Sequence, residues 1–226
     1  MPTKQQHKLA VQLPKQPTNT ILKNSYVILE NAIHSVESFL QAFTDLRGPG
    51  APTDHAQDLL RAALVFAAAG VDALVKQLVR DTLPSIVDQD IGARQQFREY
   101  VKTALLRKEQ LDIDLLADVL LADNGTEQLK AKLCRDLTSN SLQSHEQLLK
   151  VASFFAITPA SLVVTIPELK AAFAVRNQIS HEMDVDIQGT TRKRRSRKFS
   201  NMKAEAEKLI TVGLAFYNSV AQRLSP

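Results

Sequence analysis

The feature that most constrains the fold is an uninterrupted apolar run over residues 62–71, bounded by a charged residue on each side. We expect it to lie within one long helix that begins at Thr53 or Asp54 and ends near Pro84. A helix that is apolar on all sides has to be covered by other helices, which predicts the central helix of a bundle. The run is too short to span a bilayer, for which about 20 apolar residues are needed, so we expect no membrane partner.

Hydrophobic periodicity predicts further helices along the chain. A first long helix is expected over about 19–46 because its apolar stripe stops at Gly48-Pro49-Gly50. Shorter helices are expected at about 92–106, 113–121, 127–137 and 145–157, followed by a helix from Thr165 to about Asp186 and a last helix capped by Ser200. With 7 glycines and 5% aromatic residues, we predict an all-α fold: a helical bundle with two long N-terminal helices, a block of short helices, a motif helix and a C-terminal helix.

Composition also suggests how the chain is divided. Residues 1–17 are polar, contain three prolines and have no sustained period, so we interpret them as a flexible arm, extended or disordered. We assign residues 18–226 to a single α-helical domain. The segment at about 90–161 is interpreted as a helical block inserted between the long helices and the motif helix.

The chain has one cysteine, Cys134, in a helical stretch with no local sign of thiol activation, so packing explains it better than catalysis. One cysteine offers neither a disulfide framework nor a cysteine-based metal site, and it favours a reducing, cytoplasmic location. The N-terminus has no signal-peptide pattern. Four histidines lie outside the motif without metal-ligand spacing, so we predict neither a metal nor a cofactor: His7, His34, His55 and His145.

The positive charge is local. Net charge is +4, and six of the 28 Lys and Arg residues gather in one segment, while the other 22 are balanced by 24 acidic residues. The six are Arg192, Lys193, Arg194, Arg195, Arg197 and Lys198. We expect a loop there that binds RNA through its phosphates, irrespective of sequence. A disordered loop or a localisation-like tract would have the same composition, and no aromatic residue is present in the segment to stack on bases.

The predicted motif helix carries polar side chains beside an apolar face. Thr165, Pro167 and Glu168 predict a capping box at its start. At 100° per residue, one face should collect Leu169, Ala172, Phe173, Ile179, Met183 and Ile187. Arg176 falls within that face, and Asn177, His181 and Asp184 line up beside it.

A guanidinium on an apolar face keeps its charge, so Arg176 needs a carboxylate or a water-filled cleft. Asp72 and Asp184 are candidate partners for Arg176 or for His181. A structural ion pair without a functional role would give the same pattern, and its partner would be a carboxylate from another helix.

The stretch Arg176-Asn177-Gln178-Ile179-Ser180-His181 resembles the signature of the HEPN superfamily. In that signature an Arg, usually followed by a polar residue such as Asn, precedes a His by a few residues in a late helix of an α-helical bundle. The continuation Glu182-Met183-Asp184 is similar to HEPN branches of prokaryotic defence and toxin systems. The long helices and the last helix fit such a bundle, and the segment 90–161 makes the chain longer than a minimal HEPN domain.

This resemblance implies a metal-independent endoribonuclease with Arg176 and His181 as catalytic residues. Asn177 would complete the catalytic set by orienting the ring of His181 or binding a phosphate oxygen, although an ordinary exposed polar side chain is an equal alternative, and the candidate partners Asp72 and Asp184 would be the supporting acids. It also implies a homodimer whose composite site lies on the two-fold axis, and an antitoxin or defence-system partner protein. Geometry points the same way, because a five-residue spacing turns Arg176 and His181 apart by about 140° on one helix. An antiparallel second motif helix would bring one copy's His181 towards the other's Arg176.

Two other classes of function are compatible with the same sequence. One is a non-catalytic nucleic-acid-binding or scaffold protein that uses the basic loop. The other is an interaction module that neutralises another protein or assembles with it.

Overall fold

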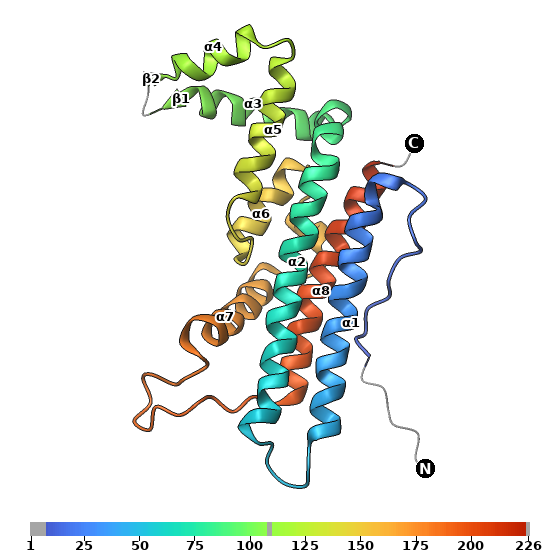
Figure 1. Cartoon of the computed structure of the whole chain (residues 1–226), viewed down its shortest axis with the longest axis vertical. Helices are drawn as coiled ribbons and strands as arrows, with labels where there is room; N and C mark the ends of the chain where they lie inside the picture. The colour runs from blue at the N-terminus through green and yellow to red at the C-terminus, as the bar shows by residue number, and fades with distance from the viewer. Residues whose placement is uncertain (1–7, 108–109, 225–226) are drawn as a thin grey trace.

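The computed structural model describes residues 8–107 and 110–224, and it confirms the all-α fold. Three long helices lie side by side as a bundle, and shorter helices gather at one end and along one side of it (Figure 1). In chain order the elements are η1 (Thr20–Leu22), α1 (Lys23–Leu46), α2 (Asp54–Gln89), α3 (Ile91–Leu105), β1 (Leu106–Arg107), β2 (Gln110–Leu111), α4 (Ile113–Leu121), α5 (Gly125–Thr138), α6 (His145–Phe154), η2 (Pro159–Leu162), α7 (Ile166–Glu182) and α8 (Phe199–Arg223).

Helix α2 is the core helix of the bundle, as its composition predicts, but the expectation that it is covered on every side is wrong. Leu74 and Leu78 are fully buried, and α1 and α8 pack along the helix. Phe66 is 48% exposed, and Ala69 and Ala73 are exposed as well. One strip of α2 is therefore open to solvent between α1 and α7.

Helix α2 would also suit a membrane span by length and composition alone. Its most apolar 18-residue window has a mean hydropathy of 1.7, and half of that window is buried within the protein. The apolar character of α2 extends beyond residues 62–71, which alone are too short to span a bilayer. The core helix of a soluble protein meets the same criteria, and the packing of α2 against α1 and α8 is that of a core helix.

Close approach of α1 to α2 depends on Gly70. A Cβ atom at this position would lie 2.4 Å from Cβ of Ala32 in α1. Such a contact is shorter than carbon atoms allow, so the two helices could not keep their present distance. Gly70 thus sets the spacing of the two longest N-terminal helices.

The predicted end of the second helix at Pro84 is wrong, because α2 continues through this proline to Gln89. Proline removes one intrahelical hydrogen bond and usually kinks or ends a helix. Here Leu83, Ile86 and Val87 are all buried around it. Their packing against the rest of the core keeps the helix going for five more residues.

Helices α3 to α6 form the predicted block of short helices, in which α3 and α5 pack against α2 and carry α4 and α6 (Figure 1). A two-residue antiparallel ladder, β1 with β2, follows α3. None of the described residues of α4 is buried, and Ile113, Leu120 and Leu121 are 70%, 74% and 86% exposed. The tip of this block therefore presents an apolar helix face to solvent.

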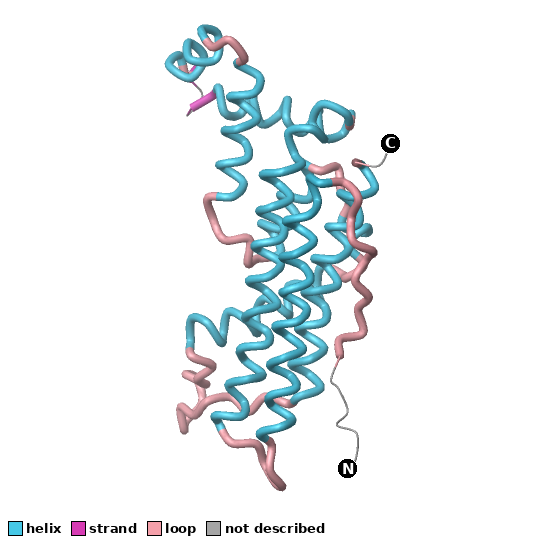
Figure 2. Tube along the Cα trace, turned by 45° about the vertical axis from the view of Figure 1, so that its right-hand side comes forward, coloured by secondary structure: helices cyan, strands magenta, loops and turns pink. Residues whose placement is uncertain are grey.

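Residues 8–17 run as a loop beside the helices (Figure 2). Leu9 is buried, its N–H donates to Glu37 in α1 over 2.9 Å, and the N–H of Ala10 donates to Glu207 in α8 over 2.8 Å. The described part of the arm is thus extended and attached to two helices. The rest of the predicted arm, residues 1–7, lies outside the described residues.

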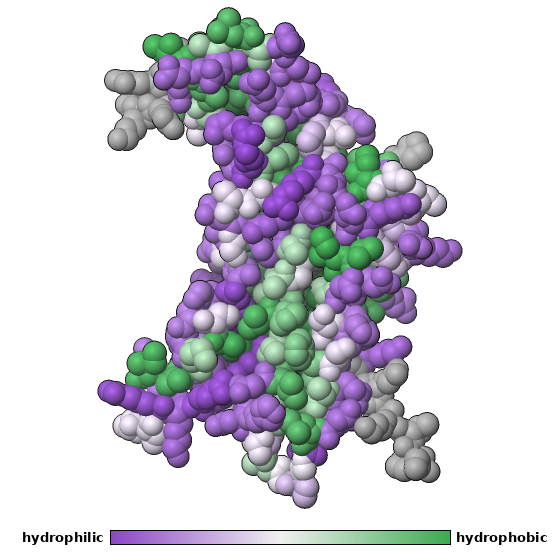
Figure 3. Space-filling view, viewed as in Figure 1, coloured by the Kyte–Doolittle hydropathy of each residue, from purple (hydrophilic) through white to green (hydrophobic). Residues whose placement is uncertain are grey.

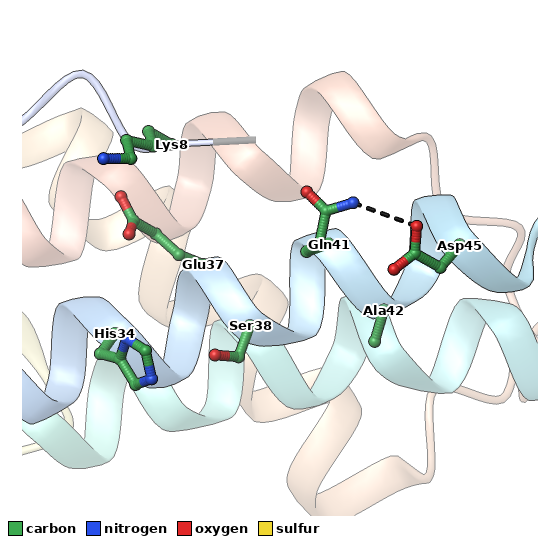
Figure 4. Close-up of a pocket in the computed structure, with 7 residues that line it drawn as sticks. All are labelled: Lys8, His34, Glu37, Ser38, Gln41, Ala42 and Asp45. Carbon is green, nitrogen blue, oxygen red and sulfur yellow. Dashed lines mark hydrogen bonds between the residues drawn. The ribbon is translucent and has the colours of Figure 1, made fainter. Parts of the chain in front are cut away.

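A groove of about 500 Å³ separates this arm from the surface of α1 (Figure 4). Its lining consists of Lys8, His34, Glu37, Ser38, Gln41, Ala42 and Asp45. The carboxylate of Glu37 faces the arm, and Gln41 donates to Asp45 over 3.2 Å. The groove therefore lies where the arm packs on α1, and none of the motif residues lines it.

Candidate functional site

Helix α7 starts as the sequence predicts. Thr165 Oγ1 accepts from the N–H of Glu168 over 3.4 Å, and Glu168 Oε2 accepts from the N–H of Thr165 over 3.1 Å. This reciprocal capping box ties down the first turn. Four of the predicted apolar residues are buried: Leu169, Ala172, Phe173 and Ile179.

The end of α7 differs from the prediction. The helix stops at Glu182 rather than near Asp186, because Met183 and Asp184 take the left-handed conformation with φ of 52° and 58°. The N–H of Asp184 then donates to Gln178 O over 2.9 Å, which closes the helix. Left-handed backbone costs about 1–3 kcal/mol for each non-glycine residue, so the surroundings have to hold this turn in place.

Met183 and Ile187 consequently do not belong to the apolar face of the helix. They lie beyond its last turn and are 67% and 61% exposed. The prediction that they share a face with Leu169 is wrong, because the periodicity ends where the backbone turns.

Arg176 is half-buried, and no carboxylate among the described residues forms the ion pair that a structural role would require. Its Nη1 donates to Asn177 Oδ1 over 3.0 Å, and its buried Nε has no partner among the described residues. Burial lowers the pKa of Arg176, and the charge of Asp72 opposes that shift. The guanidinium is therefore an under-satisfied donor group at the surface of the bundle.

His181 lies in the last turn of α7, and its side chain is exposed. Within the described part of the chain, it takes part in no hydrogen bond or ion pair. Both ring nitrogens are free to exchange protons with a bound molecule.

The predicted pairing of Asp72 with Arg176 or His181 is wrong. Asp72 Oδ2 lies 3.0 Å from Nζ of Lys76, one turn further along α2. Its Oδ1 accepts from the N–H of Leu142 over 2.6 Å. Both carboxylate oxygens are thus occupied, and Asp72 acts on Arg176 only through its charge.

The predicted pairing of Asp184 with Arg176 or His181 is also wrong. Because Asp184 follows the left-handed turn, its carboxylate points inward and is fully buried. Arg61 Nε donates to Oδ2 over 2.7 Å, and Arg197 Nε donates to the same oxygen over 3.0 Å. We call these three residues the Asp184 clasp.

Burial alone would raise the pKa of Asp184, but hydrogen bonds from Arg197 and Arg61 outweigh it and hold the pKa below its ordinary value. A buried carboxylate with two guanidinium partners stays ionised. Arg61, which is 3% exposed, is a residue that the sequence analysis did not select. Its position directly before the apolar run 62–71 was the one feature of the sequence that could have indicated a buried arginine.

The basic segment is an ordered hairpin rather than a disordered loop. Val185 and Arg194 form an isolated antiparallel bridge, and the N–H of Asp186 donates to Lys193 O over 2.9 Å. The N–H of Arg195 donates to Asp184 O over 2.8 Å at its base. We call residues 185–194 the hairpin loop.

Three of the six clustered cations are used inside the protein. Arg194 lies 2.5 Å from Asp58, Arg195 donates to Val185 O over 2.7 Å, and Arg197 belongs to the Asp184 clasp. The hydrogen bond from Arg194 lowers the pKa of Asp58. The other three have exposed side chains with no partner among the described residues: Arg192, Lys193 and Lys198.

A band of hydrophobic side chains runs along α2 beside α7 (Figure 3). Phe66 lies in this band and packs against Phe39 of α1, with ring centroids 4.9 Å apart. Exposed Ala69 and Ala73 continue it at helical spacing. The band and α7 form one face, since Asp72 of α2 is near enough to Arg176 to affect its pKa.

No group of three or more His, Cys, Asp or Glu residues in the described parts of the chain is arranged to hold a metal ion. Comparisons with protein-family models, curated proteins and solved structures give no match to this chain.

Proposed function

We propose that the protein is a metal-independent endoribonuclease of the HEPN type that acts in a prokaryotic defence or toxin–antitoxin system in the cytoplasm. The observation that carries this proposal is the state of the motif on α7: Arg176 has unused donors, Asn177 bonds to it, and His181 is exposed and unpaired. In a purely structural motif, the buried Nε of Arg176 would have a partner inside the protein.

Cleavage of RNA without a metal needs three things from these side chains. The 2′-oxygen attacks the adjacent phosphorus after giving up its proton, the bond from phosphorus to the 5′-oxygen breaks, and the leaving oxygen takes a proton. The exposed imidazole of His181 can accept the proton of the 2′-hydroxyl or give one to the leaving oxygen. Arg176 can hold the phosphoryl oxygens as their charge increases, and Asn177 fixes the guanidinium. The products are a 2′,3′-cyclic phosphate and a free 5′-hydroxyl.

A second copy of the chain supplies the complementary half of the site in this proposal. Arg176 is half-buried towards α2, whereas His181 points to solvent, so one helix does not direct both at one phosphate. The hydrophobic band on α2 lies beside α7 and is open, which suits a two-fold contact between copies. Antiparallel packing would bring His181 of the partner subunit towards Arg176.

RNA binding is assigned to the exposed cations next to α7. Arg192 and Lys193 lie on the hairpin loop, and Lys198 lies just before α8. Arg194, Arg195 and Arg197 keep the loop in shape, so their part in binding is indirect.

The test is incubation of purified protein with tRNA and total RNA in EDTA. We expect fragments ending in 2′,3′-cyclic phosphate, and no fragments from His181→Ala. An inert wild-type protein, or activity that appears only with added metal, contradicts the proposal.

A non-catalytic scaffold is the second candidate, and the exposed apolar face of α4 favours it. Ile113, Leu120 and Leu121 would suit contact with another protein, such as an antitoxin or defence-system partner. In that case wild type and His181→Ala bind RNA equally and neither cleaves it.

A further inference from the structure

The Asp184 clasp joins three segments that are distant in the sequence and meet at the end of α7. Arg61 comes from α2, Asp184 from the turn after α7, and Arg197 from the segment before α8. Two more bonds connect the first and last of these segments. Arg61 Nη2 donates to Arg195 O over 2.9 Å, and the N–H of Arg197 donates to Gln57 Oε1 over 2.7 Å. Each segment is therefore bonded to both others.

The clasp holds a backbone conformation that these residues seldom adopt by themselves. Met183 and Asp184 are left-handed in succession, and they come directly after the last turn of α7, which contains His181. Arg197 Nη2 also donates to Gln178 Oε1 over 3.0 Å, so the clasp reaches back into this turn. Without it, the turn would lose the contacts that offset its strain.

The same residue anchors the hairpin loop. The carbonyl of Asp184 accepts from the N–H of Arg195, which closes the base of the loop. The exposed cations Arg192 and Lys193 lie in its second half, where the carbonyl of Lys193 accepts from the N–H of Asp186. A displacement of Asp184 would therefore move the candidate proton-transfer group and the candidate phosphate contacts together.

We propose that Asp184 is the positioning residue of the candidate site, fixing His181 relative to Arg192 and Lys193 through its bonds to Arg61 and Arg197. The proposal rests on the proposed ribonuclease function. Asp184 touches no substrate, because its side chain is fully buried. It acts through the residues that it holds.

Asp184→Asn is the informative variant. Asparagine has the same size and tolerates left-handed backbone, so the substitution removes the charge and keeps the turn accessible. Asp186→Asn is the matched control, two residues further along. The side chain of Asp186 is 51% exposed, and its ion pair with Arg195 is long, at 3.7 Å.

Turnover of an RNA oligonucleotide in EDTA separates positioning from binding. We expect Asp184→Asn to lower kcat by roughly 10- to 100-fold with little change in KM, as is usual when a supporting residue of a site is lost. Asp186→Asn should keep wild-type kcat. An Asp184→Asn protein with wild-type kcat would overturn the proposal, as would a loss fully explained by a smaller folded fraction in circular dichroism.

Two further measurements test the positioning role of Asp184 without any ribonuclease activity. The imidazole signal of His181 in a carbon–proton correlation spectrum, assigned with His181→Ala, should shift in Asp184→Asn and stay in place in Asp186→Asn. Trypsin should first cut the wild type after Arg192 or Lys193, and should also cut Asp184→Asn early after Arg195 or Arg197. An unchanged signal and an unchanged cleavage map overturn the proposal. An inert wild type overturns the ribonuclease function instead, and these two readouts still decide whether the clasp fixes His181.

Discussion

Arg61 Nε lies 2.7 Å from Asp184 Oδ2, in a buried ion pair between residues 123 positions apart. The pair connects the second long helix to the end of the motif helix. It holds Asp184, whose side chain is fully buried, at the boundary between the core and the hairpin loop. The stability of the domain and the geometry of the candidate site therefore depend on the same contact.

Truncation of this arginine should be strongly destabilising. Arg61→Ala leaves Asp184 buried with Arg197 alone, and breaking a buried ion pair from one side costs about 3–5 kcal/mol. Urea unfolding followed by circular dichroism measures the change. Arg80→Ala is the control on the same helix, since Arg80 is exposed, and it should stay within about 0.5 kcal/mol of wild type. Equal effects of the two substitutions would contradict the assigned role of Arg61.

The clasp should also give the protein a specific sensitivity to acid. The pKa of Asp184 is below its ordinary value, so its ionised form stabilises the folded state. That contribution is fully present above the unfolded-state pKa, about 3.9, and is lost as pH falls through the folded-state pKa. The difference in Tm between wild type and Asp184→Asn should be constant from pH 7 to about pH 5 and should shrink at lower pH. A difference that stays constant into strong acid would show that the charge of Asp184 contributes nothing.

Helix spacing in the bundle gives a separate prediction. Gly70→Ala places a methyl group where the nearest carbon, Cβ of Ala32, would be 2.4 Å away. Overpacking of this kind costs about 1–3 kcal/mol. Gly48→Ala, where a Cβ would meet nothing within 4 Å, is the control. Chemical denaturation of both variants decides the matter, and unchanged stability of Gly70→Ala would be inconsistent with the close approach of α1 and α2.

Removal of the free cations should weaken RNA binding and leave stability unchanged. Arg192→Ala with Lys193→Ala removes two exposed charges without described partners, and each phosphate contact to single-stranded RNA contributes about 0.7 to the slope of log affinity against log salt. We expect the slope to become shallower by about 1.4. Arg194→Ala should lower stability instead, because Arg194 pairs with Asp58. Fluorescence anisotropy at several salt concentrations tests the first statement, and an unchanged slope contradicts it. Urea unfolding tests the second, and wild-type stability of Arg194→Ala contradicts it.

The local signals in the sequence were enough to predict most of the helices. The predicted helix over 113–121 coincides with α4, and the caps at Thr53, Ser144 and Thr165 all accept the expected backbone hydrogen bonds. The failures have tertiary causes. Packing carries α2 through Pro84, and the last helix begins at Phe199 with Lys198 before it, so Ser200 is not its cap.

The candidate site was predictable only where it is local. Arg176, Asn177 and His181 share α7, as their spacing requires. The partners of Asp184 come from residues 61 and 197, and no periodicity relates them to it. The composition of residues 192–198 was enough to predict a cluster of cations. Which of these cations are exposed depends on the path of the chain after α7. The Asp184 clasp holds that turn in place.

Cleavage of RNA in EDTA by wild type and His181→Ala, with analysis of the product ends, tests the central claim most directly. The proposed site predicts that wild type leaves 2′,3′-cyclic phosphate ends and that His181→Ala, folded and still able to bind RNA, leaves the substrate intact. Equal cleavage by both proteins, or none by wild type, would contradict it.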